Sequence, residues 1–291
     1  MQDWSGSMTA LVTPFKRGKV DEKALRSLVR AQVQAGTSAL VPVGTTGESP
    51  TLSKAEADRV IKVTVAEAKG RVKVIAGTGS NSTAESVRRT KWARRAGADA
   101  ALVVCPYYNK PTQQGVYRHY KAVSEECGLP LVVYTIPGRS VINITPETVA
   151  KLAGLKNIVA VKEASGSLAQ MAEIIAACGD RVALLSGDDS LTLPILALGG
   201  RGVISVAANL VPGEMAALVE EGLRGDFEAA RRRHYRLLPL FKALFSETNP
   251  IGIKAAMAMA KLCGPEIRLP MTPMEPGNAK ALKAAMRGLG L

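Results

Sequence analysis

The feature that most restricts how this chain can fold is an alternation of strand-like and helix-like segments that is repeated eight times. Each strand-like run is short, apolar and rich in β-branched residues, and a polar turn and a segment with helically spaced apolar residues follow it. Runs that are apolar on both faces are typical of parallel strands buried beneath helices. The predicted strands cover residues 7–15, 39–43, 72–76, 101–105, 131–136, 158–161, 182–185 and 202–206.

The helical segments between these strands carry start signals. Ser53 with Glu56, and Ser82 with Glu85, have the spacing of capping boxes. Eight strand–helix units in 291 residues predict a closed (β/α)8 TIM barrel, a fold that usually takes ~250 residues. An open doubly wound sheet is the alternative, but residues 77–82 lack the third glycine of a dinucleotide-binding fingerprint. The predicted helices cover residues 21–35, 53–69, 82–96, 145–153, 168–178 and 190–198, with one more that starts near residue 115.

The last quarter of the chain no longer alternates. Four further helices are predicted with no strand between them, at residues 213–224, 226–245, 250–262 and 278–287. We therefore divide the chain in two. Residues 1–211 hold the barrel strands and most of the barrel helices, and residues 212–291 hold the last barrel helix and a C-terminal helical appendage.

The chain is strongly basic. It has 38 lysine and arginine residues against 25 aspartate and glutamate residues, a net charge of +13. Such an excess is compatible with nucleic-acid binding. The basic residues are, however, interleaved with acidic ones on helix faces, and aromatic residues that could stack on bases make up only 4% of the chain. We therefore expect a solvated basic surface that attracts anionic substrates, not a nucleic-acid groove.

Targeting signals and metal-binding patterns are also missing from the sequence. It has no run of 18 apolar residues that could span a membrane, and residues 1–7 do not follow a signal-peptide pattern, so we expect a cytoplasmic protein. The cysteines form no CxxC pair and predict reduced thiols without disulfides or zinc. His119 and His234 fall in segments that we expect to be helical and solvated, which disfavours a catalytic role. The four cysteines are Cys105, Cys127, Cys178 and Cys263.

The strongest chemical candidate is Lys162, which follows the buried run 158–161. A lysine half inside an apolar wall is poorly solvated as the ammonium, so its pKa falls and part of it becomes the amine that attacks carbonyl groups. A fall to about 7 corresponds to roughly 4 to 5 kcal/mol. The alternative is that Lys162 simply extends from the strand end into solvent.

Three other strand ends carry polar groups, and in a barrel all of these ends meet at one face. Residues 44–49 (GTTGES) could form an anion nest after the second strand. Tyr107 and Tyr108 begin an unusually long loop after the fourth, and Tyr134 ends the fifth, shortly before Arg139. Each could instead be a turn, a core filler or a surface ion-pair partner. At residues 186–189 (SGDD) a helix N-cap at Asp189 or Ser190 is a better interpretation than a metal site.

These motifs resemble those of the dihydrodipicolinate synthase family, which belongs to the pyruvate-dependent class I lyases and aldolases. The similarity runs from residues 9–15 to residues 269–273. It implies a (β/α)8 barrel in which Lys162 forms a Schiff base with pyruvate. The enamine then adds to L-aspartate 4-semialdehyde, and ring closure gives 4-hydroxy-tetrahydrodipicolinate for lysine and diaminopimelate biosynthesis. It also implies a homotetramer built from two tight dimers, with no metal or nucleotide cofactor.

The resemblance assigns roles to single residues as well. Tyr134, Thr45 and Tyr108 match the proton-relay triad, in which the tyrosine at the Tyr108 position comes from a neighbouring subunit. The matching substrate-binding residues are Thr46 for the pyruvate carboxylate, Arg139 for the carboxylate of the semialdehyde, and Gly187 and Ile204 for the pocket wall. Thr135 departs from the asparagine that is common in the family.

Two alternatives stay open at this point. N-acetylneuraminate lyases and 2-keto-3-deoxy sugar-acid aldolases share the barrel and the lysine, although the sialate lyases lack the arginine that is Arg139 here. A non-catalytic basic binding protein on a barrel scaffold is the alternative from a different class. Borohydride trapping with pyruvate distinguishes such a binding protein from the enzymes.

The family's lysine effector pocket is matched in part. The residues that match it are Ser49, Asn81, Glu85 and Tyr107. Lys54 and Ala57, however, stand where lysine-sensitive members often carry histidine. We therefore expect weak or absent inhibition by lysine.

Overall fold

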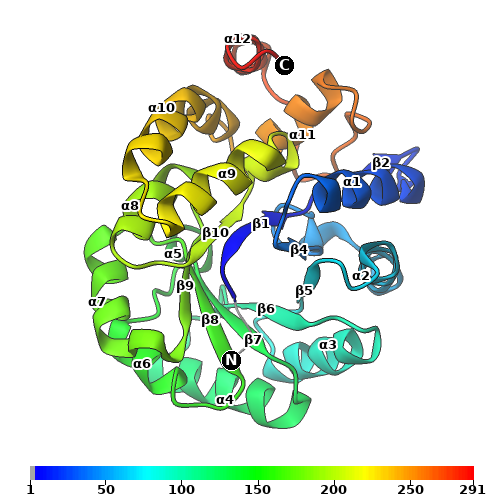
Figure 1. Ribbon diagram of the computed structural model, residues 1–291. Coiled ribbons are helices and arrows are strands. Elements are labelled where there is room, and N and C mark those ends of the chain that lie inside the picture. Colours follow the sequence, from blue (N-terminus) through cyan, green and yellow to red (C-terminus); the bar gives the residue numbers. More distant parts are fainter. Residues whose placement is uncertain (1–3) are drawn as a thin grey trace.

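The computed structural model describes residues 4–291, and eight parallel strands form a closed barrel within a ring of helices (Figure 1). The first strand pairs with both the second and the eighth barrel strand, which confirms the predicted (β/α)8 TIM barrel and excludes an open sheet. Residues 1–3, part of the segment that lacks a signal-peptide pattern, lie outside the described residues. No helix within residues 4–291 is long and apolar enough to cross a membrane.

The barrel strands lie where the apolar runs predict them, with shifts at their ends. The first is shorter than predicted, since it ends at Ala10 and the chain then turns into a small hairpin, β2 (Phe15–Lys16) with β3 (Lys19–Val20). The sixth is longer, so that Lys162 lies inside it. The barrel strands are β1 (Gly6–Ala10), β4 (Ala39–Val41), β5 (Lys73–Gly77), β6 (Ala100–Val104), β7 (Leu131–Thr135), β8 (Ile158–Glu163), β9 (Ala183–Ser186) and β10 (Gly202–Ser205).

The helices also follow the prediction closely, with one short additional helix, α5 (Pro137–Ser140), after β7. The capping box at Ser53 and Glu56 is present. At Ser82 only half of the box forms, because the Glu85 carboxylate pairs with two arginines of its own helix. The other helices are α1 (Glu22–Gln34), α2 (Lys54–Ala68), α3 (Thr83–Arg95), α4 (Gln113–Cys127), α6 (Pro146–Leu152), α7 (Leu168–Cys178), α8 (Thr192–Ala197), α9 (Pro212–Leu223), α10 (Phe227–Leu244), α11 (Ile251–Met259) and α12 (Pro276–Arg287). Single 3-10 turns are η1 (Ser49–Thr51), η2 (Gly179–Arg181), η3 (Asp189–Leu191) and η4 (Ala207–Asn209).

The strands separate two apolar cores. Alternate side chains fill the barrel interior, for example Val132 and Tyr134 of β7 and Ala160 of β8, while Val161 packs outward against the helices. Lys162 is two residues beyond Ala160, so its side chain also points into the barrel. The alternation of the strand therefore decides that this lysine faces the closed interior.

The helices after residue 211 belong to two parts of the structure, the barrel wall and the C-terminal appendage beside it. The first of them, α9, packs on β1 and β10 as the eighth barrel helix. The next three, α10, α11 and α12, pack on one another, and α10 also packs on α9 (Figure 1).

A buried ion pair joins this appendage to the loop after β4. Lys254 of α11 is 2% exposed, and its Nζ lies 3.0 Å from Oε1 of Glu48. The same ammonium donates to the carbonyl of Thr13 at 2.7 Å and lies 4.6 Å from the centroid of the Phe15 ring. Glu48 also accepts a hydrogen bond from the backbone of Arg268 at 3.0 Å. Segments far apart in the sequence are thereby fixed to one another.

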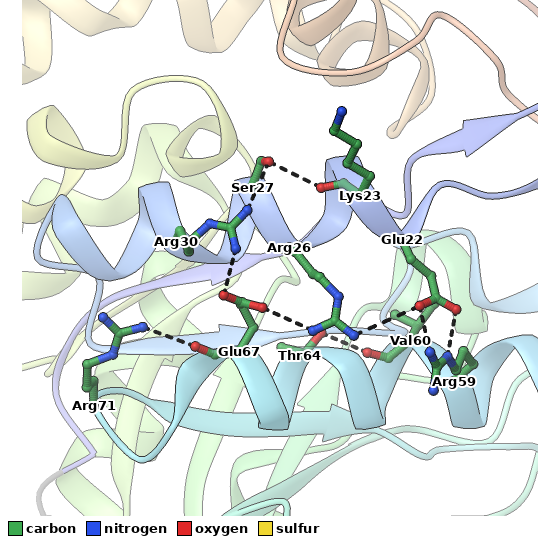
Figure 2. A network of polar contacts seen from close by, with 10 residues as sticks. All are labelled: Glu22, Lys23, Arg26, Ser27, Arg30, Arg59, Val60, Thr64, Glu67 and Arg71. Carbon is green, nitrogen blue, oxygen red and sulfur yellow. Dashed lines mark hydrogen bonds and ion pairs between the residues drawn. The ribbon is translucent and has the colours of Figure 1, made fainter.

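Many of the basic residues are paired on the outer helix faces. Figure 2 shows such a network between α1 and α2, in which Glu67 binds Arg26 and Arg30 while Glu22 binds Arg59. Exposed pairs of this kind add little to stability, but they intersperse carboxylates among the cations. The surface in this region is therefore mixed in charge, which agrees with the interleaving of acidic and basic residues in the sequence of these helices.

The histidines differ from the prediction. His119 and His234 are buried, because both lie on the core-facing sides of α4 and α10. Burial lowers the pKa of His119 to about 4, and its Nδ1 lies 2.9 Å from Oγ1 of Thr83. All four cysteines are free thiols, as predicted.

Breaking the buried pair should destabilise the fold. Lys254→Met leaves the Glu48 carboxylate buried without its cation, so we expect the free energy of unfolding to fall by about 3 to 5 kcal/mol in urea titrations. Arg59→Met, which breaks an exposed pair, is the matched control and should leave the urea midpoint nearly unchanged. Equal midpoints for the two variants would contradict this account.

Candidate active site

Lys162 lies at the centre of the candidate site. It is the residue before the end of β8, it is 6% exposed, and its register partners are Tyr134 in β7 and Leu185 in β9. Its Nζ lies 4.3 Å from the centroid of the Tyr134 ring. No group among residues 4–291 forms a hydrogen bond with this nitrogen, so nothing has to be displaced before the deprotonated amine reacts.

Burial lowers the pKa of Lys162 from 10.5 to about 8. The Asp189 carboxylate acts in the other direction and raises the pKa, while the nearby charge of Arg139 lowers it further. At pH 7 such a shift increases the neutral-amine fraction roughly 300-fold, to about one tenth. The side chain is therefore a usable nucleophile near neutral pH.

Tyr134 and Thr45 form a hydroxyl pair beside the lysine. Tyr134 is 4% exposed, and burial raises its pKa to about 12, although the Arg139 charge and a hydrogen bond with the Thr45 hydroxyl act in the other direction. The phenol is therefore neutral at physiological pH. It can donate a proton to an oxygen or nitrogen that is bound at the lysine.

The loop after β4 supplies free donors at the barrel mouth. The backbone amides of Thr45 and Thr46 have no acceptor within the described chain, whereas the next three amides bond back to Gly44 and Thr45. Thr13 Oγ1 donates to the carbonyl of Gly47 at 2.7 Å and fixes the loop from below. The arrangement can hold one carboxylate.

Arg139 lies on the short helix α5, above the end of β7. Its Nη2 donates to the carbonyl of Asn249 at 2.8 Å. The loop that follows is tied to the strand by Thr135, whose hydroxyl accepts from the backbone of Ile144 and donates to Asn143. At position 135, where the family commonly has asparagine, a threonine hydroxyl thus holds this loop to β7.

The remaining pocket residues lie at the ends of β9 and β10. Ile204 is fully buried in the barrel interior. The Gly187 amide donates to the Glu163 carbonyl at 2.7 Å, and an added Cβ would lie 2.6 Å from the Ala164 side chain, so glycine is required there. Gly187 directly follows β9, the strand next to β8, and Ile204 lies on β10, one strand further.

The turn 186–189 contains a buried acid that the motif alone did not identify. The predicted N-cap is wrong by one residue, because Asp188 accepts from Ser190 and caps the turn. Asp189 is 1% exposed, and its Oδ2 accepts from the backbone of Val206 and Ala207 while Oδ1 has no partner among the described residues. Burial raises its pKa to about 6.

Tyr108 does not reach this group within one chain. It is 87% exposed, and its φ of +72° lies in the left-handed region that non-glycine residues rarely adopt. The loop is held by Asn109, whose side chain donates to the carbonyl of Asn81 at 2.9 Å. The Tyr108 phenol is therefore open to solvent, unlike the buried Tyr134.

Only two of the four residues matched to an effector pocket line a common cavity in this chain. They are Ser49 and Glu85, which line it together with Lys54 and Trp92. Arg88 and Arg89 both bind the Glu85 carboxylate, which lowers its pKa to about 2, and Lys54 pairs with Asp58 at 2.7 Å. Asn81 and Tyr107 do not line this cavity. Within residues 4–291 no group of three or more His, Cys, Asp and Glu side chains gathers at any metal-binding distance.

Comparisons with known proteins agree with this geometry. A family model described as the dihydrodipicolinate synthetase family matches residues 3–288. The 4-hydroxy-tetrahydrodipicolinate synthase of Syntrophobacter fumaroxidans is 53% identical over 289 residues, 99% of each chain. The solved dihydrodipicolinate synthase from Aquifex aeolicus has a TM-score of 0.97 at 49% identity, over 99% of both chains. The chloride-inhibited enzyme from Acinetobacter baumannii, in complex with pyruvate, has a TM-score of 0.97 at 42% identity and the same coverage.

The Asp189 charge provides a test of the electrostatics. Asp189→Asn keeps an acceptor for the two backbone amides but removes the charge that favours the ammonium form of Lys162, so the lysine pKa should fall below about 8. The midpoint of pyruvate-adduct formation against pH should move to lower pH. Asp188→Asn is the control, because the Asp188 carboxylate does not act on the lysine, and it should leave the midpoint in place. An upward shift of the midpoint in Asp189→Asn would contradict the effect of the Asp189 charge on Lys162.

Proposed function

This chain belongs to the dihydrodipicolinate synthetase family, and we propose that it condenses pyruvate with L-aspartate 4-semialdehyde to give 4-hydroxy-tetrahydrodipicolinate, in lysine and diaminopimelate biosynthesis. It is a pyruvate-dependent lyase. The observation that carries the proposal is Lys162, a buried amine without a hydrogen-bond partner among residues 4–291 and with its pKa lowered to about 8. The synthase name of the close relatives favours this reaction over the sugar-acid aldolases.

The first step is the capture of pyruvate. The neutral Lys162 amine attacks the C2 keto carbon, the keto oxygen takes up a proton, and water leaves to form the imine. Loss of a proton from the C3 methyl group gives the enamine. The amides and hydroxyl of Thr46 and its neighbour hold the pyruvate carboxylate, so that C2 faces the amine.

The hydroxyl groups then move the protons. Tyr134, neutral because burial raises its pKa to about 12, donates the proton that lets the carbinolamine lose water, and Thr45 passes it on. The enamine carbon bonds to the aldehyde carbon of the semialdehyde, whose carboxylate binds Arg139. The substrate's own amine finally displaces Lys162 at C2 and closes the ring.

The relay is completed by a second subunit in this proposal. The exposed Tyr108, held in the left-handed region, would cross a dimer interface to the partner's Tyr134 and Thr45. Two such tight dimers would form the homotetramer. The division at residue 211 then separates the barrel strands from residues 212–291, which hold the last barrel helix and the C-terminal appendage.

We propose that pyruvate and the semialdehyde are the only partners of the catalytic centre. The imine nitrogen itself withdraws electrons from C2, so the chemistry needs no metal or nucleotide cofactor. Nucleic acid and membrane have no role in it, and both substrates are soluble metabolites, which favours the cytoplasm.

Pyruvate trapping tests the central claim. Borohydride in the presence of pyruvate should add the mass of a reduced pyruvate to the peptide that contains Lys162, and Lys162→Ala should abolish the adduct. Tyr134→Phe should slow condensation roughly 100-fold or more while it keeps the fold. A non-catalytic binding protein would show no adduct.

The acceptor is tested separately on the unmodified protein. Aspartate semialdehyde with pyruvate should give condensation, while 2-keto-3-deoxy acids should not be cleaved at a comparable rate. The reverse preference would point to an aldolase of the same family.

Lysine should inhibit weakly or not at all. Glu85 is already neutralised by two arginines and Asp58 by Lys54, so the cavity has no unpaired carboxylate among these residues to bind the lysine ammonium groups. Initial rates at increasing lysine concentration check this, and a micromolar inhibition constant would overturn it.

A further inference from the structure

The connection between α10 and α11 brings a buried side chain to the barrel mouth. Asn249 is 7% exposed, and its side-chain amide donates to Oγ1 of Thr46 at 3.0 Å. Its backbone carbonyl accepts from Nη2 of Arg139 at 2.8 Å. One residue of the C-terminal appendage thus contacts both groups to which we assign the two substrate carboxylates.

The direction of the first hydrogen bond matters for anion binding. A threonine hydroxyl has a single proton and two lone pairs. Because Asn249 donates to Thr46, a lone pair of the hydroxyl is occupied and its proton stays available for another acceptor. The amides of Thr45 and Thr46 are also without acceptors within the described chain, so three donors of the loop remain for a carboxylate, which only accepts.

The connection cannot move independently of the barrel. A Cβ at Gly252 would lie 2.2 Å from the Leu244 carbonyl, so the helices on both sides of the connection are in direct contact. Two residues further along α11, Lys254 is anchored to Glu48 and to the carbonyl of Thr13. Asn249 is therefore held against Thr46 by the packing of both helices.

We propose that Asn249 is a positioning residue for pyruvate binding, whose amide orients the Thr46 hydroxyl as a donor to the keto-acid carboxylate, while its carbonyl keeps the Arg139 guanidinium in place. The inference rests on the proposed function. Asn249 itself touches no reacting atom and acts through Thr46 and Arg139.

Two variants test whether the Asn249 side chain orients the Thr46 hydroxyl or only fills space. Asn249→Ala removes the donor but keeps the backbone carbonyl, so the KM for pyruvate should rise about 3- to 10-fold while kcat and the KM for the semialdehyde stay within about 2-fold. Asn249→Asp keeps the shape, but its carboxylate accepts the Thr46 proton and repels the substrate anion, so the KM for pyruvate should rise about 10- to 100-fold. A side chain that only fills space would give the opposite order, with alanine worse than aspartate. The aspartate variant also keeps the inference testable should the alanine variant not fold.

A double-mutant cycle tests whether the effect passes through Thr46. Thr46→Val and the double variant with Asn249→Ala should have the same KM for pyruvate, whereas additive effects would overturn the inference. The matched control is Asn157→Ala, which removes an asparagine bond to the Ser124 carbonyl at the other end of β8 and should leave the KM for pyruvate unchanged.

The two proposals fail in distinguishable ways. If the unmodified protein traps no pyruvate, the proposed function is wrong and the role of Asn249 falls with it. If the unmodified protein traps pyruvate but both Asn249 variants keep its KM, only the positioning role is wrong.

Discussion

Desolvation of one amine is the constraint on which the site depends. A barrel of eight strands has an interior just wide enough for side chains to fill it, and Lys162 takes the place of one apolar filler. The Tyr134 ring lies against its nitrogen and excludes water, while the buried Asp189 opposes complete loss of the proton. The balance leaves an amine of which about one tenth is neutral at pH 7 and which lies close to groups that supply protons.

The same site depends on contacts that come from outside the barrel repeat. The loop after β4 is closed by its own backbone hydrogen bonds, but its position is set by Glu48, Thr46 and their partners in the appendage. The ion pair at Glu48 is buried, so each charge needs the other to stay out of water. The appendage is therefore part of the anion-binding region and not an independent module.

Much of the fold could be predicted from the sequence, because each strand is a contiguous apolar run and each helix has helical spacing. The candidate residues could be predicted as well, since Thr45, Tyr134 and Lys162 all lie at strand ends that a barrel brings to one face. Asn249 could not, because its partner lies 203 residues away and no local pattern indicates that contact. The burial of His119 was missed for a related reason, since it depends on which face of α4 meets the strands.

The pairing of β1 has a consequence for how the protein is made. This first strand needs β10 as its neighbour, and the loop after β4 needs Lys254 to neutralise Glu48. A nascent chain on the ribosome that has not yet reached β10 therefore exposes an open sheet edge, and one that has not yet reached α11 leaves the Glu48 carboxylate without its cation. The loop after β4 can reach its final arrangement only after α11 has been made, so incomplete chains of this protein are candidates for chaperone binding.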